Sequence, residues 1–403
     1  MTTAQASSRT GWRGALGPAF ITAALVFGPG SITTASSMGA GFSYQLLWVP
    51  VIATVLMLCF VDLAVRIGLT TDTGPVGTIA GRLGRVIGVA AGIGAFLVTA
   101  SFQAGNSAGT GAAGTVLFGS GTAVFAAVFT LLAIGFLWLP AFYRYLERTM
   151  VVIILLMLVI FVITAIVSRP DPVAMLGGLL PTLPQGSTSL VVGAAATTFS
   201  VVGALYQIQL VREKGWGPDD YRTARRDAVV GSLILGSLSM VIMIAAAAVL
   251  HPAGVEVTSP VDMATILTPT VGRWATVLFA VGLWAAAFSS LVGNSTIGGG
   301  MLAGALRVDR GGLRSVPVKL CITAVMVLGG IVAIAFGRVP LQLIVTAQAV
   351  TILIAPLIGI VMLVLARHAD RGRLRIGVPQ LVLALLGLAF LFTLAGNYLI
   401  NLL

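Results

Sequence analysis

The sequence predicts an all-α membrane protein with eleven transmembrane helices, of which the first and sixth are interrupted near the middle of the membrane. Three observations predict this fold class. Hydrophobic residues make up 58% of the 403 residues and charged residues only 9%, with a mean hydropathy of +1.06. A soluble domain carries roughly 25% charged residues, because its surface must meet water. The other two observations are a series of long apolar segments and two clusters of helix-breaking or polar residues within them.

The apolar segments give the expected helices in order. A transmembrane helix needs about 20 mainly apolar residues. Eleven segments meet this requirement, at approximately 17–38, 45–68, 86–109, 121–141, 150–168, 188–211, 228–250, 274–303, 316–336, 340–366 and 377–402. We expect residues 1–403 to form one transmembrane domain with a cytoplasmic N-terminal segment at 1–16. The first five-helix repeat would span 17–168, the second 188–366, and 377–402 would be an additional eleventh helix.

Basic residues predict the orientation. If the N-terminus is cytoplasmic, 20 of the 23 Lys and Arg residues fall on the cytoplasmic side, and only Arg169, Arg273 and Arg338 fall outside. This asymmetry follows the positive-inside rule and places the C-terminus outside. It also explains the net charge of +11 without a nucleic-acid partner. We therefore expect an integral protein of a prokaryotic cytoplasmic membrane, whose surroundings are the lipid bilayer, and we expect a monomer.

Acidic residues are absent from the predicted middle of the membrane. Of the twelve Asp and Glu residues, only Asp62 lies within an apolar segment, near its cytoplasmic end and four residues before Arg66. That spacing predicts an ion pair on one helix face. Both histidines, His251 and His368, lie at loop edges. The core thus offers hydroxyls, amides and backbone groups, and it lacks the carboxylates that hold a dehydrated divalent cation or relay protons.

The first segment is interrupted at Gly28-Pro29-Gly30-Ser31. Proline removes a backbone donor, and the flanking glycines permit non-helical torsions. In lipid, such a break is tolerated only where it is buried in protein or lines a cavity. A kink that serves helix packing alone is the structural alternative.

The sixth segment has a polar cluster at Thr197-Thr198-Phe199-Ser200, where no proline or glycine pair forces a break. A helix that is kinked but continuous remains an alternative at this place. The two clusters stand five helices apart, so the two five-helix halves would run through the membrane in opposite senses. Interrupted helices at matching places in inverted halves point to the central site of a secondary transporter.

Several motifs resemble the Nramp family of divalent-metal transporters, which has the leucine-transporter fold. The motifs are Gly17-Pro18-Ala19-Phe20, Gly28-Pro29-Gly30-Ser31, Tyr44-Gln45-Leu46-Leu47-Trp48-Val49, Pro181-Thr182-Leu183-Pro184, Leu205-Tyr206, Phe288-Ser289-Ser290 and Gly298-Gly299-Gly300. The likeness extends over nearly the whole chain. It implies the 5+5 inverted repeat and an alternating-access carrier.

The chain departs from the family where the family binds its substrate. The family's first-helix signature, Asp-Pro-Gly-Asn, has Gly28 and Ser31 here in place of its Asp and Asn. Its sixth-helix signature, Met-Pro-His, falls on Val201, Val202 and Gly203. The acidic pair of the proton path on the third helix falls on Gln103 and Asn106. We therefore expect neither a transition-metal site nor the family's proton coupling.

The residues present at the family's substrate-binding positions suit a small anion. An interrupted helix exposes backbone N–H groups and a partial positive charge at the start of its second half, here near Gly30-Ser31. We expect this position to bind a small anion, most of all bicarbonate, which the resemblance also implies because some divergent Nramp-related branches look like bicarbonate carriers. The candidate substrate-binding residues are Gly28, Pro29, Gly30, Ser31, Thr197, Thr198, Phe199 and Ser200.

Other polar residues have possible roles along the pathway. Gln103, Asn106 and Gln348 are candidate pathway residues, although amides between helices also serve packing. Ser289, Ser290 and Asn294 are candidate ligands of a coupling sodium ion, together with carbonyls of the first helix. No other cofactor is expected.

Three alternatives stay open. A divalent-cation transporter of the Nramp type, carrying magnesium or manganese, would keep the family's chemistry, since a hydrated ion needs fewer direct ligands. A channel would share the interrupted helices. A membrane-embedded enzyme is not expected, because the apolar segments contain no acid-base pair, histidine-rich motif or activated nucleophile.

Overall fold

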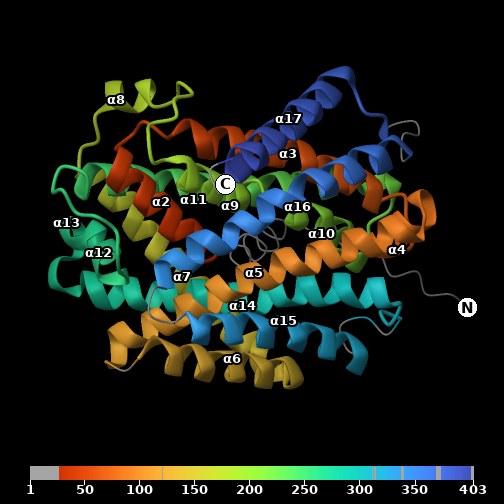
Figure 1. The fold of residues 1–403 in the computed structure, drawn as a ribbon, viewed down its shortest axis with the longest axis horizontal. Coiled ribbons are helices and arrows are strands. Elements are labelled where there is room, and N and C mark those ends of the chain that lie inside the picture. The colour runs from red at the N-terminus through yellow and green to blue at the C-terminus, as the bar shows by residue number, and fades with distance from the viewer. Residues whose placement is uncertain are drawn as a thin grey trace, which may run out of the picture.

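The protein is a bundle of long helices (Figure 1). The computed structural model describes residues 27–119, 121–310, 312, 315–336, 340–368 and 374–400. Its α-helices are α2 (Pro29–Phe42), α3 (Trp48–Gly68), α4 (Pro75–Leu83), α5 (Arg85–Phe118), α6 (Thr122–Trp138), α7 (Pro140–Val167), α8 (Pro172–Gly177), α9 (Thr188–Thr198), α10 (Val201–Glu213), α11 (Tyr221–Val249), α12 (Pro260–Ala264), α13 (Thr268–Val271), α14 (Ala275–Leu306), α15 (Val316–Ala335), α16 (Pro340–His368) and α17 (Val378–Ile400). Three short 3₁₀ turns are η1 (Pro218–Asp220), η2 (Thr265–Leu267) and η3 (Gly272–Trp274).

The helices have the length and composition of membrane spans. In the described residues, eight helical stretches are long and apolar enough to cross a bilayer, and two shorter apolar helices cover Thr122–Trp138 and Val152–Val167. Large apolar side chains such as Leu131, Ile166 and Leu357 are exposed on the outside of the bundle. Such a surface requires a lipid environment, because soluble proteins rarely expose contiguous apolar patches. The chain is an integral membrane protein, and the exact number of eleven spans stays a prediction.

The longest helices form the centre of the bundle. The 34-residue α5 packs along α14, α15 and α16, and α2 packs against α11 and α9. In Figure 1, α8, α12 and α13 lie at one end of the bundle and α4 lies at the other. We call the latter the arginine-rich end, because it carries Arg66, Arg82, Arg85, Arg212 and Arg307 at the ends of α3, α4, α5, α10 and α14.

Several helices, α5 and α7 most of all, are longer than the hydrophobic segments predict. The sequence prediction ends at residue 109 because the glycines beyond it lower helix propensity. The helix nevertheless continues to Phe118, because these glycines allow close packing. A Cβ on Gly114 would lie 2.5 Å from Cγ of Phe125 on α6, so only glycine fits there. The segment at 150–168 begins at Pro140 instead, ten residues earlier, because charged residues near its start exclude those residues from an apolar window.

A buried ion-pair network joins three helices near the arginine-rich end. Asp62 on α3 pairs with Arg66 Nε at 2.8 Å, as their spacing predicts, and also with Arg225 Nε at 3.0 Å. Tyr221 on α11 donates to Asp62 Oδ1 at 2.8 Å, and Gln380 on α17 donates to Asp62 Oδ2. This network fastens α17 to the rest of the bundle.

Candidate functional site

The helix α2 begins at the predicted first interruption. Gly28 is extended, with φ −107° and ψ −177°, and Pro29 is the first residue of the helix. Proline suits that position because its missing N–H would have no acceptor there. The N–H groups of Gly30 and Ser31 begin the helix and have no acceptor within it. Residues 17–26, where the first half of the predicted helix falls, lie outside the described residues.

The second interruption separates α9 from α10. Thr198 ends α9, Phe199 and Ser200 are non-helical with ψ of 66° and 88°, and α10 begins at Val201. The hydroxyl of Ser200 accepts a hydrogen bond from Gly203 N at 3.2 Å and so caps α10. This N-capping serine is the sequence signal that locates the break between the two helices.

The two interruptions meet at one small cavity. Its volume is about 20 Å³. Its lining residues are Gly28, Gly30, Ser31, Phe102, Asn106, Thr197, Ser200 and Asn294. Except for Phe102, these are all predicted site residues, and they come from α2, α5, α9, α14 and the two breaks. A cavity of about 10–15 Å³ by this measure holds one water molecule, so the cavity has room for about one.

Several buried polar atoms around the cavity have no hydrogen-bond partner in the described chain. They are Ser290 Oγ, Gln103 Nε2 and both polar atoms of the Gln348 carboxamide. By contrast, Thr34 and Thr197 donate to carbonyls of their own helices. An unpartnered buried polar atom is costly, so these atoms are available to a ligand or to water.

Gln348 on α16 is held between two interrupted helices. A Cβ on Gly30 would overlap Gln348 Nε2, and a Cβ on Gly193 of α9 would lie 2.5 Å from Gln348 Oε1. The carboxamide therefore occupies a space that exists only because both positions are glycine. Gln348 is fully buried, at 1% exposure.

Two predicted sodium ligands lie at the first interruption. Ser290 on α14 is so close to Gly28 that a Cβ there would lie 3.1 Å from Ser290 Oγ. Asn294, one turn along α14, lines the cavity. The third, Ser289, donates to the carbonyl of Ala286 at 3.1 Å within its own helix.

Other predicted residues lie beside the cavity but not on its wall. Phe199 is buried against Phe60 of α3, with ring centroids 5.0 Å apart, so its side chain packs away from the cavity. Pro29 packs against Gly109 of α5, and Gln103 packs against Gly329 of α15. Thr198 lines a second hollow of about 10 Å³, shared with Ser31 and Thr197.

None of the described residues that line the cavity has an ionisable side chain. In the part of the chain that the structure describes, no group of three or more His, Cys, Asp or Glu side chains is placed to hold a metal ion. Two helix N-termini, those of α2 and α10, contribute residues to the lining. The local field is therefore that of N–H dipoles, hydroxyls and amides.

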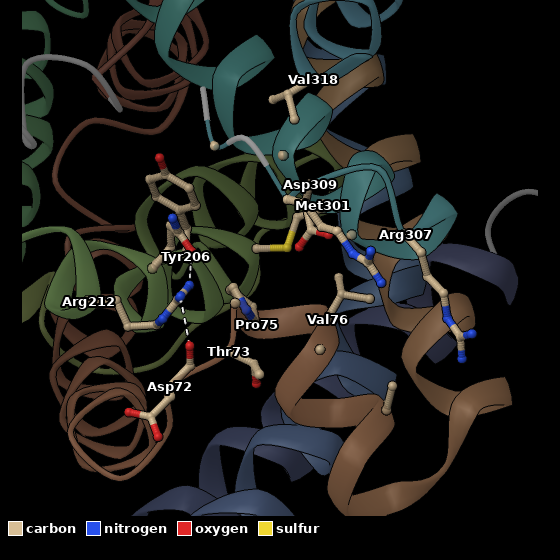
Figure 2. Close-up of a pocket in the computed structure, with 18 of the residues that line it drawn as sticks. Asp72, Thr73, Pro75, Val76, Tyr206, Arg212, Met301, Arg307, Asp309 and Val318 are labelled. Carbon is tan, nitrogen blue, oxygen red and sulfur yellow. Dashed lines mark hydrogen bonds between the residues drawn. The ribbon is translucent and has the colours of Figure 1, made fainter. Parts of the chain in front are cut away.

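A much larger cavity, of about 580 Å³, lies at the arginine-rich end (Figure 2). It is formed by the loop before α4, the α10 helix, and the end of α14 with the loop that follows it. The sequence gives no prediction of this cavity, because its arginines indicate only the orientation of the chain in the membrane. The cavity depends on segments that are distant in sequence, including Arg85 of α5 and Val318 of α15, and no local motif marks it.

Comparisons with known proteins place these features in a wider group. Residues 19–401 match the family described as natural resistance-associated macrophage protein-like, or Nramp. A divalent metal cation transporter, MntH, of Mycobacterium tuberculosis is 29% identical over 357 residues, covering 85% of this chain and 81% of that protein. The MntH of Aeromonas hydrophila is 26% identical over 342 residues, covering 83% and 82%.

Solved structures share the fold. A mutant of the Eremococcus coleocola manganese transporter superposes with a TM-score of 0.79 at 19% identity, covering 98% of this chain and 88% of that one. The nucleobase-cation-symport-1 family transporter MHP1 superposes with a TM-score of 0.60 at 16% identity, covering 94% and 91%. At sequence identities this low, the similarity shows the fold but not the substrate.

Proposed function

We propose, for a chain that belongs to the Nramp family of membrane transporters, that the transported substrate is a small anion, most of all bicarbonate, carried by alternating access. The observation that carries this proposal is the uncharged lining of the central cavity. A dehydrated divalent cation requires carboxylates or soft ligands in place of its water shell. The position of Gly28 at the first interruption has no side chain to repel an anion.

The available donors also support an anion. Ser31 and Ser200 bring hydroxyls to the cavity wall, whereas Asn106 donates through Nδ2 to Gln103 Oε1 at 3.4 Å and has its Oδ1 toward Gly28. The unpartnered Oγ of Ser290 lies next to Gly28. A planar oxyanion accepts several such hydrogen bonds, and the N-terminus of a helix stabilises its charge. In this proposal Gly28, Pro29, Gly30 and Ser31 form one wall, and Thr197, Thr198 and Ser200 form the other.

The small size of the cavity favours a carrier cycle rather than an open channel. Its volume of about 20 Å³ leaves room for about one water molecule among the described residues. A bicarbonate ion has four heavy atoms, so α2 and α9 would have to separate to admit it. Ser290 and Asn294 would then bind a coupling sodium ion beside the first interruption. The arginine-rich end would face the cytoplasm, as the positive-inside rule requires.

Uptake into proteoliposomes tests the substrate. Purified protein would be reconstituted and given radiolabelled bicarbonate, manganese or magnesium in parallel, with protein-free vesicles as the blank. We expect saturable bicarbonate uptake that exceeds the blank and no saturable uptake of either metal. Saturable metal uptake without bicarbonate uptake would reject the anion.

A divalent cation is the second candidate, and the printed names of the relatives favour it. Both MntH proteins are named as divalent metal cation transporters, and the structural neighbour is named as a manganese transporter. With no carboxylate on the cavity wall, such a cation would have to keep part of its water shell, as magnesium readily does. The same proteoliposome assay separates the two candidates.

A further inference from the structure

One hydrogen bond sets the direction of the Asn106 side chain at the central cavity. Its Nδ2 donates to Oε1 of Gln103, one turn earlier on α5, at 3.4 Å. Both side chains are buried, with 3% of Asn106 and 0% of Gln103 exposed. Because a carboxamide carries its donors and its acceptor on opposite arms, this bond leaves Oδ1 of Asn106 facing Gly28. A Cβ on Gly28 would lie 3.0 Å from that oxygen.

The hydrogen bond belongs to α5 alone. Residues three apart lie on the same face of a helix, so the pair forms without a neighbouring helix. Gln103 is held in its turn against α15, where a Cβ on Gly329 would overlap its Cγ. The helices α2 and α9, which are proposed to separate when a substrate enters, contribute nothing to the bond. The direction of the Asn106 acceptor therefore does not depend on the helices that move.

A second polar atom lies beside the same α-carbon. Ser290 on α14 has a buried Oγ without a partner in the described chain, 3.1 Å from the position of a Cβ on Gly28. A serine hydroxyl donates one hydrogen bond and also accepts, whereas the amide oxygen of Asn106 only accepts. The space beside Gly28 thus has an acceptor on one side and a hydroxyl on the other. These two atoms suit a guest that itself carries an O–H group.

An acceptor at this place distinguishes one anion from another. Nitrate and chloride have no hydrogen, so Asn106 Oδ1 would repel them and would itself remain unpaired. Hydrogencarbonate is planar and monoanionic like nitrate, but one of its three oxygens bears a proton. That O–H can donate to Asn106 Oδ1, while the other two oxygens accept from N–H groups at the start of α2 and from the hydroxyls of Ser31 and Ser200.

We propose that Asn106 is a specificity-determining residue, which selects an oxyanion that carries an O–H group over an anion of the same shape and charge that lacks one, and that Gln103 positions it. This inference rests on the proposed transport of a small anion. A site built to hydrogen-bond a hydroxyl rejects the analogue without it, because the buried acceptor is then left unpaired. A bound cation would use the same oxygen, and sodium dependence separates these two roles.

Competition between two planar anions tests the selection. Proteoliposomes with the full-length protein would take up radiolabelled bicarbonate in the presence of unlabelled nitrate or unlabelled bicarbonate. We expect the wild type to need at least about 10-fold more nitrate than bicarbonate for half-inhibition. In Asn106→Leu, which removes the acceptor at similar size, this ratio should approach one.

A second variant tests the positioning role of Gln103. Gln103→Met keeps Asn106 but removes the oxygen that holds its Nδ2, so the amide is free to turn Nδ2 toward Gly28. The ratio of nitrate to bicarbonate should therefore fall in this variant as well, an effect that a loss of packing alone would not produce. Gln207→Met is the matched control, because it removes a buried amide on α10 that does not line the central cavity. It should keep the wild-type ratio.

The outcomes distinguish this inference from the proposed function. Absence of saturable bicarbonate uptake by the wild type would reject the proposed function and this inference with it. Bicarbonate uptake that nitrate and unlabelled bicarbonate inhibit equally would reject the inference alone, as would an unchanged ratio in Asn106→Leu. A raised sodium requirement in Asn106→Leu with an unchanged ratio would assign Asn106 Oδ1 to a cation instead. If Asn106→Leu does not fold, the ratio in Gln103→Met decides.

Discussion

The carboxamide of Gln348 lies directly against Gly30, so that α16 touches the first turn of α2 where that helix begins. Gln348 is buried, and neither of its polar side-chain atoms has a partner in the described chain. A ligand or water between α2 and α9 would satisfy them. The contact places Gln348, a predicted pathway residue, directly beside Gly30, a predicted substrate-binding residue.

Gly30→Ala should abolish transport and lower stability. The added methyl group would overlap Gln348 Nε2 and force the carboxamide out of its place between Gly30 and Gly193, and overpacking of this kind costs typically about 1–3 kcal/mol. Uptake by proteoliposomes and the melting temperature measure the two effects. Gly41→Ala is the control, because a Cβ there meets no atom within 4 Å. If Gly30→Ala transports at the wild-type rate, the close contact is irrelevant to the cycle.

Gly28→Asp should abolish anion uptake by placing a negative charge at the first interruption. The new Cβ would lie 3.0 Å from Asn106 Oδ1, so the side chain fits after a small shift. Gly28→Asn adds the same bulk without the charge and should retain more bicarbonate uptake than Gly28→Asp. Equal uptake by the wild type and Gly28→Asp would show that the substrate binds elsewhere.

Ser290→Ala should raise the sodium concentration that gives half-maximal uptake. The buried Oγ of Ser290 is unpartnered and lies beside Gly28, which suits a ligand of a coupling sodium ion. Uptake would be compared in sodium and choline buffers for the wild type and the variant. Ser289→Ala is a matched comparison, because the Ser289 hydroxyl already donates within its own helix. Wild-type uptake that is the same in both buffers would argue against sodium coupling.

Asp62→Asn should lower the free energy of unfolding by roughly 3 kcal/mol, because removal of one partner leaves the buried Arg66 charge uncompensated. A shift of the melting temperature in detergent measures the loss. Asp72→Asn serves as the control, since Asp72 is exposed and its carboxylate makes no ion pair among the described residues. Similar melting temperatures for the two variants would mean that the network around Asp62 adds little.

The sequence predicts the long helices because an apolar run of membrane length leaves the backbone few alternatives. It also indicates the start of α2 at Pro29, where proline and glycine act locally. The break at Phe199-Ser200 has only a capping serine as its signal, and the orientation of Phe199 toward Phe60 depends on α3. The short α4 and α8 lie between the apolar segments, where the hydrophobic pattern gives no indication of helix.

Contacts between segments that are distant in the sequence could not be predicted from it. Gln348 could be chosen as a polar residue on a predicted helix, but its place between Gly30 and Gly193 depends on how α2, α9 and α16 pack. The grouping of the arginines around the large cavity could not be predicted for the same reason. Each is an ordinary basic residue at a helix end, and only the fold brings Arg85, Arg212 and Arg307 to one hollow.

The described residues around the central cavity leave room for about one water molecule. We expect cargo to enter only when helices of the bundle separate, because a hydrated ion does not fit that space. Turnover is then limited by helix motions on the microsecond-to-millisecond scale and not by diffusion.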